Sequence, residues 1–143
     1  MRCSGCDSLK PRNWLGTPGE GPVLEFESFI KIFFADQGNK ADALAALGYV
    51  REWAREREVE NVAIAQGYLA GTGPFPERAA VLAVTGRFLT DFADMVGAWA
   101  DWATTVVEDW PEDPKDAQPI WQVFEDIASL GNLSDTKTAG QKP

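Results

Sequence analysis

The sequence predicts an all-α protein, an antiparallel helical hairpin of two long helices with a buried N-terminal helix and a short C-terminal helix. Apolar residues recur at steps of three and four over two long stretches, 39–70 and 76–110, as on one face of an amphipathic helix. The reversal between them, 71–76 (GTGPFP), is short enough to make the two helices antiparallel neighbours.

We divide the chain into a flexible N-terminal segment (1–22), a helical domain (23–131) and a disordered tail (132–143). The first segment is interrupted repeatedly by Gly and Pro, which favour loops. The tail is short and polar, as poorly ordered chain ends often are. With 143 residues, 45% of them hydrophobic, the chain is long enough for one domain with a packed core.

The first expected helix covers 23–36 (VLEFESFIKIFFAD). Its Phe and Ile content also suits a strand, but the alternation of a strand fails at Phe29-Ile30 and at Phe33-Phe34, so a helix is favoured. Few of its positions are polar. We therefore expect this helix, which Gly38 ends, to be buried on most sides.

The second expected helix begins at Asn39, a good N-cap, and runs to Leu69-Ala70, with Gly71 as its stop. One seam follows a heptad-like spacing through Ala43, Leu47, Val50, Ala54, Arg57, Asn61, Ile64 and Tyr68. The middle of this helix, 51–60 (REWAREREVE), is highly charged. Two interpretations stay open there: a solvated face with local Glu–Arg pairs, or a seam whose register Arg57 and Asn61 set.

The turn that follows places Phe75 where we expect it to tuck back as a hydrophobic plug. The third helix then begins near Pro76, which fits a first helical turn, and cannot continue past Pro111. At ~1.5 Å per residue this helix spans about 50 Å, which suggests a partner helix in this chain or another. An acidic connector, 111–119, leads to a short helix over 120–130 that Gly131 stops.

Composition excludes several functions. The net charge is −9, and residues 88–126 hold ten acids and one base, so we expect no direct nucleic-acid binding. The sequence has no run of about 18 apolar residues and no apolar signal-peptide core, which predicts a cytoplasmic protein without a membrane span.

Catalysis is not expected either. The chain has no His, which excludes His-based triads and acid–base pairs, and no phosphate-binding Gly loop. Cys3 and Cys6 form a C-x-x-C without two further Cys or His ligands, so a terminus without metal is favoured over metal binding between chains or thiol redox chemistry. We expect no enzyme activity, no metal and no cofactor.

The third helix carries an unusually aromatic stripe, and this is the candidate site. The stripe is made by Phe88, Phe92, Met95, Trp99, Trp102 and Val106. Two interpretations stay open: a core or subunit interface, or a flat apolar slot for a planar ligand with Trp99 and Trp102 as walls and Trp53 as a third. Asp91, Asp94 and Asp101 lie off the stripe, which favours a solvated face over a carboxylate metal site.

Several segments resemble the C-terminal region of PadR-type transcriptional regulators, particularly the actinobacterial kind. They are the helix LEFESFIKIFFAD (24–36), the long charged helix after it, the turn GPFPER (73–78) and the Trp-rich helix closing on Asp109-Trp110-Pro111. The likeness covers 14–130, and 14–18 (WLGTP) is similar to the junction where that family leaves its winged helix-turn-helix.

The resemblance implies a dimerisation and effector module. In that family an N-terminal winged helix binds DNA, and the C-terminal helices dimerise and help to sense ligands such as phenolic acids or planar drugs. Only thirteen residues precede Trp14, too few for a winged helix. We therefore expect a module without its own DNA-binding domain, either truncated or naturally trimmed, that forms a homodimer or pairs with a full-length relative.

Overall fold

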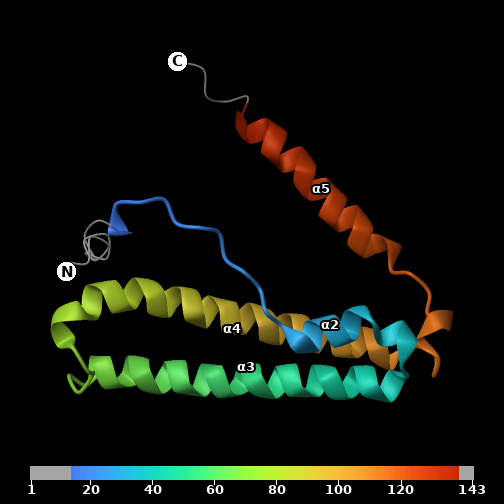
Figure 1. Ribbon diagram of the computed structural model, residues 1–143, viewed down its shortest axis with the longest axis horizontal. Coiled ribbons are helices and arrows are strands. Elements are labelled where there is room, and N and C mark those ends of the chain that lie inside the picture. Colours follow the sequence, from blue (N-terminus) through green and yellow to red (C-terminus); the bar gives the residue numbers. More distant parts are fainter. Residues whose placement is uncertain (1–13, 139–143) are drawn as a thin grey trace, which may run out of the picture.

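The computed structural model describes residues 14–138, with side chains described through Leu130. This part of the chain contains helices and no strand (Figure 1). The α-helices are α2 (Glu27–Phe33), α3 (Lys40–Leu69), α4 (Ala79–Glu108) and α5 (Trp121–Thr138), and the short 3₁₀ helices are η2 (Ala35–Gln37), η3 (Pro76–Arg78) and η4 (Pro114–Asp116). The prediction of an all-α protein in which two long helices pack together is confirmed.

The main packing is between α3 and α4, which lie side by side along their length (Figure 1). At one end, the Lys40 ammonium donates a hydrogen bond to the carbonyl of Glu108 at 2.6 Å. Further along α3, Arg51 pairs with Asp101.

Both ends of α3 are set by residues that the sequence indicates. The Asn39 side chain accepts a hydrogen bond from the backbone N–H of Asp42 at 2.9 Å, which satisfies one of the free donors of the first turn. Gly71, just beyond the C-terminus, has a φ of 74°, a conformation that a side chain disfavours. The predicted start and stop of this helix are confirmed.

The first helix is shorter and more exposed than predicted. It begins at Glu27 rather than Val23, and none of its residues is buried. Phe33 is 73% exposed, whereas Phe26 and Ile32 pack against the core. The prediction of burial on most sides is wrong for the single chain, because the α3–α4 pair covers one side of α2 and nothing in the described chain covers the others.

The turn between the long helices is filled by Tyr68 rather than by Phe75. The Tyr68 hydroxyl donates to the carbonyl of Pro74, and its ring lies so close to Gly73 that a Cβ there would come within 2.5 Å. Phe75 is 64% exposed and has a φ of 53°. The predicted plug at Phe75 is wrong because its left-handed backbone directs the side chain outward.

The last helix is longer than predicted. α5 continues through Gly131 to Thr138, where the sequence predicts a stop and a disordered tail. Gly costs only about 1 kcal/mol relative to Ala inside a helix, so it ends a helix reliably only where the backbone turns left-handed. The end of α4 at Glu108, just before Pro111, agrees with the prediction.

The core lies in one half of the α3–α4 pair. Its buried residues are Ala43, Ala46, Leu47, Val50 and Ala54 on α3 and Ala93, Val96, Ala100, Ala103 and Val107 on α4. Ala35 and Pro114 add to it from η2 and η4. The halves nearest the turn, 55–69 and 79–92, contribute no buried residue. The predicted α3 seam is thus buried in its first half and open from Arg57 onward.

The described part of the N-terminal segment, 14–22, is exposed. The Thr17 hydroxyl donates to the carbonyl of Trp14 at 2.7 Å, closing a local turn. Cys3 and Cys6, and the expectations for them, lie outside the described residues.

Candidate association face and apolar pocket

The aromatic stripe of α4 is not the face that packs on α3. The buried residues of α4 lie one position further along the helix, on a stripe of Ala and Val. A shift of one residue turns the face by about 100° on a helix. As a result Phe88, Met95 and Trp102 remain 65%, 57% and 48% exposed. Of the stripe, Phe88, Met95 and Trp102 are therefore exposed, whereas Phe92 and Trp99 are half-buried and pack against the core.

Trp99 lies under α2. Its ring centroid is 5.8 Å from that of Phe29 and 6.2 Å from that of Phe26, in tilted and edge-on arrangements that aromatic pairs prefer. Met95 and Trp102 stand one turn to either side of Trp99 on the same face of α4. We define the aromatic face as the exposed residues around this contact, namely Phe29, Phe33, Met95 and Trp102.

A second aromatic group bridges α3 and α4. The rings of Trp53 and Phe92 meet edge to face with their centroids 6.2 Å apart, and Phe88 stacks on Phe92 at 6.4 Å. The structure thus divides the six predicted site residues. Trp53, Phe88 and Phe92 form one group, whereas Trp99 belongs to the contact with α2.

A pocket of about 400 Å³ opens where the segment before α2 and the start of α2 cross α3 and α4, a size typical of ligand sites. Its lining residues are Leu24, Glu25, Phe26, Glu27, Ser28, Tyr49, Val50, Trp53, Phe92 and Val96. Trp53 and Phe92 are predicted site residues. Trp99 and Trp102 do not line it, so the slot that the sequence predicts between these two residues is not the pocket that the structure forms.

Three of the aromatic and apolar walls, Leu24, Phe26 and Tyr49, are absent from the predicted site. Leu24 and Phe26 belong to a helix that the sequence suggests is core, and Tyr49 lies off the α3 seam. The only signal in the sequence is the four Phe residues within 23–36, and it does not extend to Tyr49. These residues come together because α2 packs across α3 and α4. The periodicity of a single helix does not predict how helices pack on one another.

The mouth of this pocket is acidic. The Lys31 ammonium hydrogen-bonds the Glu27 carboxylate at 2.8 Å, and this hydrogen bond and the positive charge lower the pKa of Glu27. The two side chains are 62% and 82% exposed, so solvent screens the pair strongly. Glu25 also lines the pocket, and no basic side chain does.

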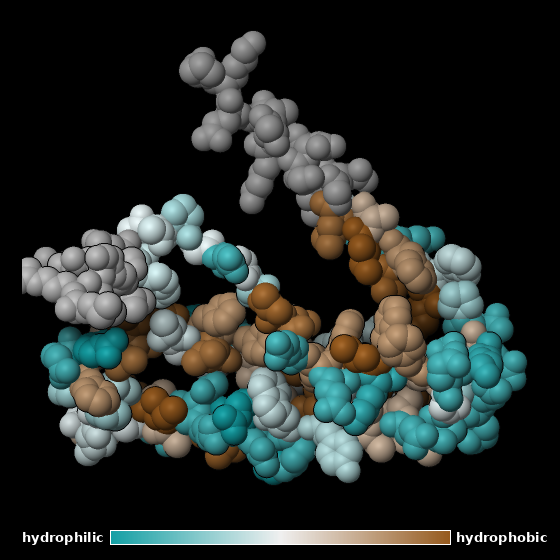
Figure 2. All heavy atoms as spheres, viewed as in Figure 1, coloured by the Kyte–Doolittle hydropathy of each residue, from teal (hydrophilic) through white to brown (hydrophobic). Residues whose placement is uncertain are grey.

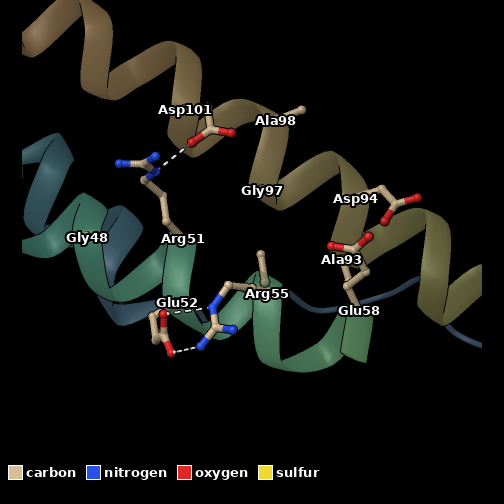
Figure 3. A pocket seen from close by; sticks show the side chains of 11 residues that line it. Gly48, Arg51, Glu52, Arg55, Glu58, Ala93, Asp94, Gly97, Ala98 and Asp101 are labelled. Carbon is tan, nitrogen blue, oxygen red and sulfur yellow. Dashed lines mark hydrogen bonds and ion pairs between the residues drawn. The ribbon is translucent and has the colours of Figure 1, made fainter. Parts of the chain in front are cut away.

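A larger hollow, of about 610 Å³, lies along the α3–α4 seam (Figure 3). Its floor consists of small residues, including Gly48, Ala54 and Gly97. On its rim Arg51 reaches across to Asp101 at 2.5 Å, while Arg55 turns back to Glu52 on its own helix. Exposed ion pairs of this kind contribute little stability each, and they give the hollow a charged rim.

The charged middle of α3 mainly forms local pairs. Arg55 bonds Glu52, and Arg57 bonds Glu60 at 2.9 Å, each within one turn of the helix. Arg57 is half-buried, and its Nε is buried without a hydrogen-bond partner. The interpretation as a solvated face with local pairs therefore describes most of this segment, and Arg51, which crosses to α4, is the exception.

Residues 14–138 contain no group of three or more His, Cys, Asp or Glu side chains placed to hold a metal ion. Over the same range, every helix is too short or too polar to cross a membrane. No family model matches this chain, and neither a curated protein nor a solved structure does. Function must therefore be inferred from the residues and their arrangement.

Proposed function

We propose that this chain is an association module of the kind that forms the C-terminal dimerisation region of PadR-type transcriptional regulators. In this proposal α3 and α4 form an antiparallel hairpin, and the partner is a second copy of the chain or a full-length relative. The sequence motifs motivate the family. The observation that supports association is the large apolar surface left exposed on the single chain.

The chain exposes more surface than a compact monomer of its mass. A compact monomer of 15.7 kDa exposes about 7,300 Å², whereas this chain exposes 12331 Å². Residues outside the described range contribute at most about 2,900 Å², the area of an unfolded segment of that mass. The remaining excess of roughly 2,000 Å² per chain matches what each partner buries in a large obligate dimer.

The chemistry of the exposed surface points the same way. The aromatic face combines Phe29, Phe33, Met95 and Trp102, and both aromatic residues and Met are enriched at protein interfaces. An apolar patch of this kind on a monomer marks an interaction site or an aggregation liability. The net charge of −9 makes separate assemblies repel one another, but it does not prevent a close apolar contact between two chains.

Light scattering coupled to size exclusion tests the proposal directly. We expect a dimer at tens of micromolar, and Trp102→Glu should shift it toward monomer because a buried, unpaired carboxylate opposes association. Thr105→Glu, at an exposed position off the stripe on the same helix, is the matched control and should leave the dimer intact. A wild-type monomer at that concentration would overturn the proposal.

Pairing with a full-length relative has its own test. Co-expression with a winged-helix regulator that carries the same C-terminal motifs should give a mixed dimer, detectable by purification through a tag on one chain. Mobility shifts with this chain alone should show no DNA binding at physiological salt, because residues 88–126 repel phosphate. Binding of DNA by the isolated chain would contradict the charge argument.

The pocket supports a second candidate function, the sensing of a planar hydrophobic ligand. Trp53, Phe92, Phe26 and Tyr49 provide aromatic walls for such a ligand, and Trp53 gives a fluorescence readout. We expect the neutral planar dye Nile red to bind and Phe92→Ala to weaken binding at least tenfold. Phe88→Ala, which removes a ring stacked on Phe92 but outside the pocket, is the control. Equal effects of both variants would contradict a site at this pocket.

A further inference from the structure

Among the described residues, no other helix covers α5. Figure 1 shows it projecting away from α2, α3 and α4, and it makes no extended contact with any of them. Figure 2 shows brown, hydrophobic spheres along one side of this helix and teal, hydrophilic ones along the other. Four apolar residues on that side, which we call the α5 apolar face, are Val123, Phe124, Ile127 and Leu130.

This face is too exposed for a helix that stands alone. Phe124, Ile127 and Leu130 are 61%, 61% and 62% exposed. Helices of about this length are marginal in water, and most helical stability in proteins comes from packing an amphipathic face. A helix of 18 residues with a bare apolar face therefore requires a surface to cover it.

The connector to α5 directs it away from its own core. η4 is fixed to the body by the buried Pro114 and by a hydrogen bond from the Lys40 N–H to the Glu112 carbonyl at 3.3 Å. Beyond it Ala117 is extended, with a ψ of 138°, and Pro119 restricts the residue before it to extended backbone as well. The direction in which α5 leaves the body is therefore set by the stiff segment that follows η4, and η4 itself is anchored to the body.

From this geometry we infer that α5 is exchanged between two copies of the chain, so that the α5 apolar face of each packs on the aromatic face of the other. This inference rests on the proposed dimer. The two surfaces are both apolar, and both are exposed in the single chain. In a dimer with two-fold symmetry, the exchange buries each surface in both copies. The excess exposed area of roughly 2,000 Å² per chain is of the size that such a swap removes.

A second copy fits better than a membrane surface. Helices that lie on membranes are rich in Lys or Arg on their polar face, whereas α5 contains three acids (Glu125, Asp126 and Asp135) and one base, Lys137. The acidic side of α5 would be repelled by anionic lipid. The appropriate partner is therefore a protein surface with exposed apolar and aromatic groups, because such a surface binds α5 without the help of positive charges on the helix.

Cross-linking between distinguishable chains tests the exchange. In chains with Cys3→Ser and Cys6→Ser, unlabelled Ile127→Cys protein is mixed with ¹⁵N-labelled protein carrying Phe33→Cys, Met95→Cys or Trp102→Cys, and a short bis-maleimide is added. We expect labelled-to-unlabelled cross-links with at least one of the three, at least tenfold above those from Gln122→Cys on the polar face. Mass spectrometry separates them from links between two labelled or two unlabelled chains.

The outcomes distinguish the exchange from the dimer itself. If light scattering shows a dimer but cross-links form only when Ile127→Cys and the second cysteine are placed together in one chain, α5 folds on its own chain and the exchange is overturned. If the wild-type chain is monomeric, both the exchange and the proposed function are overturned.

Loss of the α5 apolar face gives an independent measurement. Phe124→Ala should raise the dimer dissociation constant at least tenfold, because buried aromatic anchors dominate interface energetics. Gln122→Ala, on the polar side of the same helix, should change it less than twofold. A chain truncated after residue 119 that retains the wild-type dissociation constant, with α3 and α4 intact by circular dichroism, would overturn the exchange.

Discussion

Gly97 of α4 lies directly against Ala54 of α3, so that a Cβ built on Gly97 would come within 3.2 Å of the Ala54 Cβ. This contact sets how closely the two long helices approach midway along the α3–α4 pair. It also marks the limit of the core, because no residue of α3 beyond Ala54 is buried. By contrast, a Cβ on Gly86, further toward the turn, would meet nothing within 4 Å.

The first prediction compares these two glycines. Gly97→Leu should destabilise the fold by about 1–3 kcal/mol, because the extra atoms force the helices apart. Gly86→Leu should stabilise it by up to about 1 kcal/mol, since Leu favours the helix and meets no obstacle. Urea denaturation followed by circular dichroism measures both. Equal free energies of unfolding for the two variants would show that α3 and α4 do not pack at Gly97.

The second prediction concerns the centre of the core. Leu47 is fully buried, so Leu47→Ala should cost about 2–5 kcal/mol of unfolding free energy through lost burial and a residual cavity. Leu69→Ala, on the same helix but at a side chain that is 89% exposed, should change it by less than about 0.5 kcal/mol. Similar losses for both would place the core elsewhere on α3.

The third prediction concerns the end of the α3–α4 pair at which α3 begins. The Lys40 ammonium donates to the carbonyls of Glu108 at 2.6 Å and Trp110 at 2.9 Å, which satisfies acceptors that the end of α4 leaves free. Lys40→Met keeps the aliphatic stem and should cost about 1.5–3 kcal/mol in chemical denaturation. Lys115→Met, at an exposed site on η4, serves as the control and should have little effect.

The fourth prediction is a pH dependence at α2. Lys31 lowers the pKa of Glu27, so the pair contributes stability above the ordinary carboxyl pKa and loses it as the pH falls through the lowered value. Lys31→Met should therefore raise the Glu27 pKa toward its ordinary value. Carboxyl NMR titration of both proteins measures it, and an unchanged Glu27 pKa would show that the ion pair does not form in solution.

Local residue chemistry predicts helix boundaries here with good success. Asn39, Gly71 and Pro111 act within one turn of the chain, and each ends or begins a helix as expected. Errors occur where the same residue type permits two conformations. Gly131 lies within α5, and Phe75 takes a left-handed backbone that turns its side chain away from the core.

The candidate site is less predictable because it depends on how helices rotate against one another. Periodicity identifies the stripe containing Phe92, Trp99 and Trp102, but the close approach at Gly97 selects the neighbouring Ala and Val stripe as the buried one. The position of α2 then separates Trp99 from the pocket and brings Tyr49 and Phe26 into it.

The sequence by itself determined the all-α class, the extents of the two long helices and the acidic character of the C-terminal half, because these depend on local propensity, caps and composition. Only the tertiary structure decided which stripe of α4 is buried, which side of α2 is covered and where α5 points. The physical reason is that small residues allow helix backbones to approach closely. The two long helices therefore pack on Ala, Val and Gly97, and aromatic residues such as Phe88 and Trp102 are left on the surface.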